Sequence, residues 1–186
     1  MPRLNRQHAF YKSIFNYPQL VPPGVNITHV SRVIDVGAGT GAWALDFVSL
    51  PYVRNRDLQV FACDISTEKF PRNDDLKVRK ITWFQQDVTK PFEDALLGTF
   101  DLINLSFMSF ALTARGWQVA LRNLYSLLSK RYFTSMEPRY PNTNAQSPVD
   151  VFSYGMVILS HIIARILRRL MVSRPTLLHP YKAHRT

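Results

Sequence analysis

The sequence is poor in cysteine and has no long apolar run. Cys63 is the only cysteine among 186 residues, which excludes an intrachain disulfide and a zinc site built from several thiolates. No stretch of roughly 18 uninterrupted apolar residues occurs, which argues against a conventional membrane span. The first eight residues lack the apolar core of a secretory signal. We therefore expect a soluble cytoplasmic protein, with the nucleus as the alternative, and no metal site.

Acidic residues are scarce in one half of the chain only. The net charge is +10, and residues 111–186 carry 11 basic but only 2 acidic side chains, against 12 and 11 in residues 1–110. A basic half can indicate an anionic partner, although arginines solvated on a helix face give the same composition. No recognition helix or aromatic RNA-binding signature is visible, so we expect no nucleic-acid partner.

Apolar residues make up 46% of the chain, enough for the core of one globular domain. Strand-like and helix-like segments alternate, which predicts an α/β fold with a mostly parallel sheet of about five strands. The expected strands are 32–36, 58–63, 81–86, 100–106 and 132–136. The expected helices are 7–16, 42–50 (closed by Pro51), 116–128 and 149–172.

A glycine-rich loop lies between the strand 32–36 and the helix that follows it. Three of the seven glycines, Gly37, Gly39 and Gly41, fall within five residues. Glycine accepts a positive φ and lets a ligand approach the backbone, and such a turn lies at the ligand-binding end of a parallel strand. The alternative is a tight turn without a ligand. The pattern at 39–44 also fits the dinucleotide motif G-x-G-x-x-G/A. Asp35, however, suits an ammonium group better than a pyrophosphate.

Two more carboxylates follow the next two expected strands. Asp64 follows the second strand, where it can accept both hydroxyls of a ribose. Asp87 follows the third, where it can accept the amino group of an adenine. Each alone is more often a turn residue, but acids at three consecutive strand ends indicate a nucleoside ligand.

These residues resemble the class I S-adenosylmethionine-dependent methyltransferases. The likeness is closer to the fungal small-molecule methyltransferases of the secondary-metabolism type, and it runs from about Arg3 to Tyr140. The segments that carry it, in the family's order, are 4–10, 33–47, 63–66, 86–92, 98–104 and 111–125. The resemblance implies a Rossmann-like three-layer sandwich and S-adenosylmethionine as cofactor.

The resemblance also implies a role for each matching residue. The glycines would let the methionine part of the cofactor lie against the backbone, Asp35 would favour its ammonium group, and Asn104 would border the methyl acceptor. Asp64 would bind the ribose, and Asp87 with the Val88 backbone would hold the adenine. The full set of expected cofactor-binding residues is Asp35, Gly37, Ala38, Gly39, Gly41, Asp64, Ile65, Asp87, Val88 and Asn104.

The same resemblance divides the chain into parts. We expect a lid-like helix and loop at 1–30, the cofactor-binding core at 31–140, a covering helix at 141–172 and a basic tail at 173–186. The family fold continues into a closing antiparallel hairpin, for which residues 173–186 are too few. We therefore expect a truncated member whose substrate half is incomplete. A helix at 149–172 with an apolar stripe and arginines opposite covers the sheet or, alternatively, contacts a membrane surface or a second copy.

The expected function is transfer of a methyl group from S-adenosylmethionine to a small-molecule acceptor. The alternatives are a remnant or regulator that binds the cofactor without transferring the methyl, and an NAD-dependent oxidoreductase. We assign no catalytic residue from the sequence. His8 is a candidate general base near the lid, although a lone histidine is more often structural.

Overall fold

A computed structural model describes residues 3–15, 20–21, 27–72, 76–108 and 111–136. The expected helix at 149–172 and the basic tail lie outside the described residues. Within these ranges no helix combines the length and the hydropathy needed to cross a membrane.

A five-stranded parallel sheet forms the centre of the described chain. The strands are β1 (Arg32–Val36), β2 (Gln59–Asp64), β3 (Ile81–Gln85), β4 (Phe100–Ser106) and β5 (Leu128–Met136). Their order across the sheet is β3-β2-β1-β4-β5. The chain therefore runs outward from β1 to one edge and then returns to start again on the other side. This order is that of a Rossmann-like fold, and it confirms the expected α/β class.

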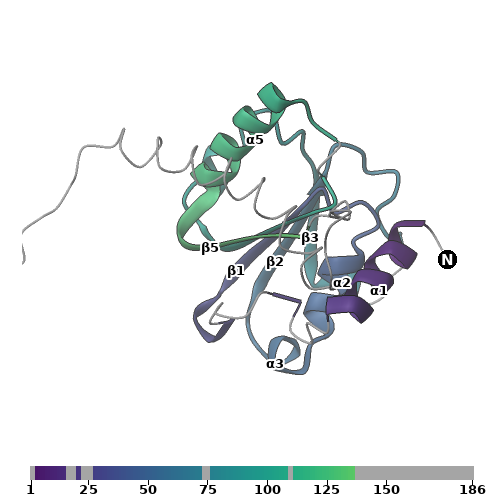
Figure 1. Ribbon diagram of the computed structural model, residues 1–186. Helices are drawn as coiled ribbons and strands as arrows, with labels where there is room; N and C mark the ends of the chain where they lie inside the picture. Colours follow the sequence, from purple (N-terminus) through teal and green to yellow (C-terminus); the bar gives the residue numbers. More distant parts are fainter. Residues whose placement is uncertain (1–2, 16–19, 22–26, 73–75, 109–110, 137–186) are drawn as a thin grey trace, which may run out of the picture. The chain divides into compact units, whose positions relative to one another are not determined.

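Helices cover both faces of the sheet. They are α1 (Arg3–Phe15), α2 (Ala42–Ser49), α3 (Pro51–Arg54), α4 (Leu76–Arg79) and α5 (Ala114–Leu127), with short 3-10 turns η1 (Ile27–His29) and η2 (Asp94–Leu96). Figure 1 shows α5 on one face of the sheet and α2 on the other, with α1 beside α2. The three layers follow from two connections, β1 to β2 through α2 and β4 to β5 through α5. Because these connections run in opposite directions across the sheet and parallel connections have one handedness, their helices lie on opposite faces.

The core beneath α2 is built from apolar side chains that alternate along the strands. Val33 of β1 and Leu102 of β4 are fully buried in it, and Phe47 of α2 packs against the same cluster. Trp43 stacks on Phe47 with ring centroids 4.8 Å apart, and its indole N–H donates to the Leu20 carbonyl. This packing fixes α2, and with it the glycine loop at its amino terminus.

Several expected boundaries differ from the structure by one or two residues, such as the start of α5 at Ala114 instead of 116. Three further differences have a physical reason. The first helix begins at Arg3 instead of residue 7, because its polar first turn makes side-chain contacts with residues far along the chain. Pro51 opens α3 as its first residue instead of only closing α2, since proline is tolerated where no backbone donor is needed. β5 begins at Leu128, directly after α5, and pairs there with Phe100 before a shift in register.

Candidate functional site

The glycine loop joins β1 to α2 at the carboxyl edge of the sheet. Gly37, Gly39 and Gly41 have φ values of 71°, 55° and 69°, a region that residues with a Cβ adopt only at a cost. Added Cβ atoms would also collide with side chains. A Cβ on Gly41 would lie 2.2 Å from Cη2 of Trp83, and one on Gly39 would lie 2.8 Å from Cδ1 of Leu4. The loop therefore requires glycine at these positions.

A cavity of about 170 Å³ opens beside this loop. Asp35 of β1, Asp64 of β2 and Ser106 of β4 lie at its edge. β1 lies between β2 and β4 in the sheet, so the cavity is at the point where the strand order reverses. Open parallel sheets bind their ligands at this position.

Asp35 supplies the one buried carboxylate oxygen of the described residues that has no hydrogen-bond partner. Only 3% of the residue is exposed, and its Oδ1 accepts a 2.7 Å hydrogen bond from the Asn104 amide. Its Oδ2 accepts none. Burial raises the pKa of Asp35 to about 7, against the opposing effect of the Asn104 hydrogen bond. An unpaired buried carboxylate is costly, and a cationic donor in the cavity would relieve that cost.

Asp64 lies beside the same loop and is already partly engaged. Its Oδ2 accepts a 2.7 Å hydrogen bond from the Gly39 backbone N–H, and its Oδ1 accepts a 3.2 Å bond from that of Ser66. The next residue, Ile65, is 65% exposed although it is large and apolar. Such a pair of residues suits a nucleoside: the carboxylate can accept the ribose hydroxyls, and the exposed apolar side chain can pack against the flat base.

Asp87 lies apart from the residues that line the cavity. Its Oδ1 accepts hydrogen bonds from both the backbone N–H and the hydroxyl of Thr89, which lower the pKa of the carboxyl group. The neighbouring Val88 is buried, and its carbonyl accepts from the Asn123 amide. Asp87 thus closes a turn here, the more common role of such a residue. Its adenine-binding role stays a prediction.

Asn104 links β4 to β1 through the hydrogen bond that its amide donates to Asp35. It lies opposite Asp35 in the parallel register, and its carbonyl oxygen accepts from the Ser106 hydroxyl at 3.1 Å. The expected residues Asp35, Gly37, Ala38, Gly39 and Asp64 all line the cavity. The other expected residues do not line it: Gly41, Ile65, Asp87, Val88 and Asn104.

Nine lining residues were not expected as cofactor contacts: Thr40, Ala42, Trp43 and Ser106 beside expected positions, and Leu4, His8, Lys69, Phe107 and Met108. Phe107 and Met108 directly follow β4, so the rule that ligands lie at strand ends could have found them. Phe107 has a φ of 60°, rare for an aromatic residue, and its ring lies 4.8 Å from that of Tyr11 on α1. Leu4 and His8 come from α1, and only their long-range contacts reveal their position.

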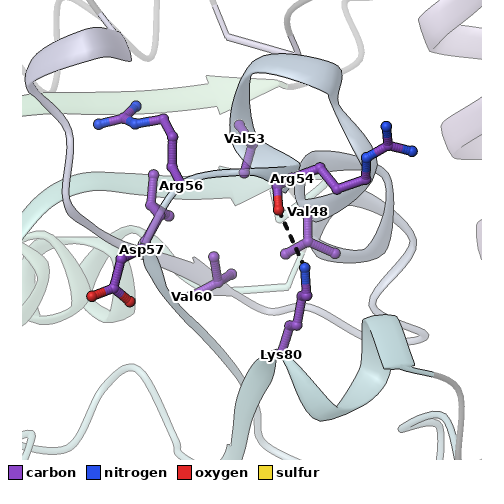
Figure 2. Close-up of a pocket in the computed structure, with 8 residues that line it drawn as sticks. Val48, Val53, Arg54, Arg56, Asp57, Val60 and Lys80 are labelled. Atoms are coloured by element: carbon purple, nitrogen blue, oxygen red, sulfur yellow. Dashed lines mark hydrogen bonds between the residues drawn. The ribbon is translucent and has the colours of Figure 1, made fainter.

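A second cavity, of about 190 Å³, lies at the opposite edge of the sheet, where β2 and β3 begin. Figure 2 shows Lys80 pointing to the Arg54 carbonyl, to which it donates a 3.3 Å hydrogen bond. The guanidinium groups of Arg54 and Arg56 extend away from the valines in the middle of the view. Because its polar groups diverge, this cavity lacks the features of a ligand site.

A cavity of this kind occurs in more than one class of enzyme, so we compared the chain with known protein families. A family model described as a methyltransferase domain matches residues 33–131, more than half of the chain. The chain belongs to this methyltransferase family. The match begins within β1 and ends within β5, so it includes the glycine loop, the whole of β2, β3 and β4, and part of β1 and β5. The resemblance seen in the sequence is confirmed.

Two fungal proteins are similar in sequence to this methyltransferase-family chain. N-methyltransferase tcpN of Claviceps purpurea is 33% identical over 107 residues, which is 57% of this chain and 36% of that protein. Methyltransferase grgD of a Penicillium species is 26% identical over 130 residues, or 68% of this chain and 44% of that protein. The chain thus spans less than half the length of these relatives.

A solved structure shares the fold. An S-adenosylmethionine-dependent methyltransferase from Aquifex aeolicus superposes with a TM-score of 0.58 at 16% identity, covering 83% of this chain and 77% of that one. At this identity the likeness concerns the fold, and it agrees with the parallel sheet order described above.

Proposed function

We propose that the chain binds S-adenosylmethionine in the glycine-loop cavity and serves methyl transfer to a small-molecule acceptor. The observation that carries the proposal is the Asp35 carboxylate, buried at the carboxyl edge of β1 with one oxygen unpartnered. The family membership of residues 33–131 and the name of the Aquifex aeolicus neighbour support the same cofactor.

The residues present fit this cofactor. Its ammonium group would meet the free Oδ2 of Asp35, and its methionine backbone would lie where Gly37 and Gly39 lack a Cβ. Asp64 would accept the ribose hydroxyls, and Ile65 would pack on the adenine. Asp87, Val88 and Asn104 keep the roles that the resemblance implies. When bound, the cofactor supplies a methyl group on a sulfonium sulfur, a good leaving group for a nucleophilic oxygen, nitrogen or carbon.

The chain's main contribution is alignment of the two reactants in a site that excludes water. Well-oriented reactants can gain roughly 7–11 kcal/mol relative to free encounter. The cavity of about 170 Å³ is smaller than the roughly 300 Å³ at the low end of ligand pockets. The Met108 side chain lies against Gly37 and that of Leu4 against Gly39. Cofactor entry therefore requires these two flexible side chains to turn away.

An NAD-dependent oxidoreductase is the competing class, and the same carboxylate argues against it. A pyrophosphate beside Asp35 would place negative charge next to a buried carboxylate. An active methyltransferase and a remnant that only binds the cofactor would have the same cofactor site. Measured methyl transfer to an acceptor distinguishes these two alternatives.

Isothermal titration of the chain with S-adenosylhomocysteine and, separately, with NADH tests the proposal. We expect saturable binding of S-adenosylhomocysteine only, and a loss of at least 30-fold in affinity for Asp35→Ala and Asp64→Ala. Asp57→Ala is the matched control, because Asp57 lies at the opposite edge of the sheet. Tighter binding of NADH, or equal affinity in all three variants, rules the proposal out.

A further inference from the structure

Helix α1 lies against the glycine loop and contributes one titratable side chain to the cavity. The Thr40 hydroxyl donates a 2.5 Å hydrogen bond to the Asn5 side-chain oxygen, and Leu4 lies against Gly39. One turn further along α1, His8 is 8% exposed and lines the cavity together with Asp35 and Gly37. The mechanism described so far gives this imidazole no role.

The His8 side chain is in hydrogen-bond contact with Asp46 of α2. Its Nε2 lies 3.0 Å from Oδ2 of Asp46, and the same oxygen accepts a 2.8 Å hydrogen bond from Lys12. The hydrogen bond from His8, together with Lys12 and against the effect of burial, holds the pKa of Asp46 at about 2. The carboxylate is therefore ionised near neutral pH and can only accept hydrogen bonds.

This contact decides which ring nitrogen carries the proton. Because an ionised carboxylate cannot donate, Nε2 of His8 must bear the hydrogen, and in the neutral imidazole the lone pair is on Nδ1. Among the described residues no hydrogen bond to Nδ1 is present. A carboxylate that fixes the tautomer of a histidine whose second nitrogen is available is the arrangement of an oriented base.

We propose that His8, positioned by Asp46, is the general base that removes a proton from the methyl acceptor. The inference rests on the proposed function and narrows the acceptor to a group that still carries its proton at neutral pH, such as a phenolic hydroxyl or a protonated amine. The acceptor's bond to hydrogen breaks, its electron pair stays on the oxygen or nitrogen, and the proton moves to Nδ1. The resulting imidazolium returns the proton to water after transfer.

Charged groups from several elements lie around His8. Asp35 of β1, Asp64 of β2 and Lys69 of the following loop line the same cavity. Asp46 of α2 and Lys12 of α1 line a neighbouring cavity that His8 also lines. Of these charged groups, Asp46 is the one in direct contact with the imidazole.

The competing explanation is that His8 and Asp46 merely fasten α1 to α2. Lys12 distinguishes the two explanations, because it also links α1 to Asp46 but does not line the cavity beside the glycine loop. Lys12→Met therefore tests the fastening, whereas His8→Asn removes the base. His29→Asn, at an exposed histidine of η1, is the control for loss of a histidine.

The first measurement is the tautomer of His8 by long-range ¹H–¹⁵N correlation of the imidazole in the full chain. We expect the Nε2–H form with a lone pair on Nδ1, and a mixed population in Asp46→Asn. A Nδ1–H form in the unaltered chain, or the same spectrum in Asp46→Asn, overturns the assignment.

The second measurement is methyl transfer from radiolabelled S-adenosylmethionine to a panel of simple phenols and primary amines. We expect His8→Asn to lower kcat by about 10²–10⁴-fold with less than threefold change in affinity for S-adenosylhomocysteine. Lys12→Met and His29→Asn should stay within threefold. An equal loss of cofactor affinity in His8→Asn and Lys12→Met supports fastening instead.

The two proposals fail differently. If the unaltered chain does not bind S-adenosylhomocysteine, the proposed function itself is wrong. If it binds the cofactor product but methylates no member of the panel, the base assignment is overturned and the cofactor site stands.

Discussion

The two edges of the sheet carry cavities of similar size but opposite chemistry. The cavity at the carboxyl edge measures about 170 Å³ and the one at the amino edge about 190 Å³. At the amino edge the buried carboxylate and most other polar groups are satisfied by the chain itself. Arg56, for example, donates hydrogen bonds of 2.7, 3.1 and 2.7 Å to the carbonyls of Ile27, Thr28 and Val30. Nε of Arg32 is buried without a hydrogen-bond partner, but its guanidinium lies over the rings of Phe61 and Phe100. Volume therefore does not distinguish the two edges.

Two buried aspartates make the difference explicit. Asp101, at the amino edge of β4, accepts from the Ser31 backbone and hydroxyl, the Arg32 backbone and the Ser129 hydroxyl. Burial alone would raise the pKa of Asp101, but these hydrogen bonds hold it below its ordinary value. Asp35, at the carboxyl edge of β1, accepts one side-chain hydrogen bond, from Asn104, and has a pKa raised to about 7. The carboxyl edge is thus marked by a buried carboxylate oxygen that the fold leaves without a partner.

Substituting the two aspartates should change stability in opposite directions, and this is the largest effect we expect. The pKa of Asp35 rises from 3.8 to about 7 on folding, so stability is lost as the pH rises through this window. Between pH 4 and 8 the unfolding free energy of Asp35→Asn should gain on the order of 4 kcal/mol relative to the unaltered chain. Urea unfolding at both pH values measures it.

Asp101→Asn is the counterpart. Because the pKa of Asp101 is lowered in the folded state, its contribution to stability is present above the unfolded pKa and is lost as the pH falls. The variant should be less stable than the unaltered chain at pH 7, and the gap should close in acid. If the stability difference from the unaltered chain changed with pH in the same direction for both variants, the contrast between the two edges would be wrong.

The glycine loop should tolerate no side chain, whereas a glycine elsewhere with the same backbone should. Gly41 and Gly98 have φ values of 69° and 68°, but an added Cβ meets Trp83 only at Gly41 and has nothing within 4 Å at Gly98. Gly98→Ala should cost about 1–2 kcal/mol for the left-handed backbone, and Gly41→Ala about 1–3 kcal/mol more for the collision. Equal losses in urea unfolding would refute the packing argument.

Arg56 at the amino edge should affect stability alone. Arg56→Met removes the donors to three carbonyls while keeping most of the aliphatic stem, and we expect a loss of roughly 2 kcal/mol. Its affinity for S-adenosylhomocysteine should stay within twofold, as isothermal titration can check. A large drop in affinity would mean that the two edges are coupled.

The smallest effect concerns pH and cofactor affinity. Burial raises the pKa of Asp35 to about 7. If the ligand ammonium pairs with ionised Asp35, affinity for S-adenosylhomocysteine should therefore fall as the pH drops below this value. The limit is about tenfold per pH unit, or roughly 1.4 kcal/mol. Methylthioadenosine, which lacks the amino-acid part, should not show this dependence. If the affinities of both ligands changed equally with pH, the titrating group would be one other than Asp35.

The sequence predicts best what depends on neighbouring residues. The β-branched run before Gly37 and the glycines up to Gly41 predict β1, the loop and the start of α2 correctly, because strand propensity and positive φ are local properties. The parallel strands then bring Asp35, Asp64 and Asn104 to the same edge, as expected for neighbours in this topology.

Contacts between distant residues could not be predicted. The pair His8 and Asp46 is separated by 38 positions, and nothing near either residue indicates the other. The early start of β5 was missed because a helix followed by a strand without a turn residue gives no local signal. The link between Ser31 and Asp101 depends on the strand register in the same way.

The direct passage from α5 to β5 has a consequence for how the chain tolerates changes in length. Since α5 ends at Leu127 and β5 begins at Leu128, no residue is left to absorb an insertion. One extra residue at this junction would shift the backbone register between β5 and β4, which begins with the pair Leu128 and Phe100. Even the loop at Gly98, where an added Cβ would meet nothing within 4 Å, is linked to this end of α5, because the Gly98 N–H donates a 2.8 Å hydrogen bond to the Ser126 carbonyl. A tag or a neighbouring domain inserted at the end of α5 would therefore disturb both the sheet and this link.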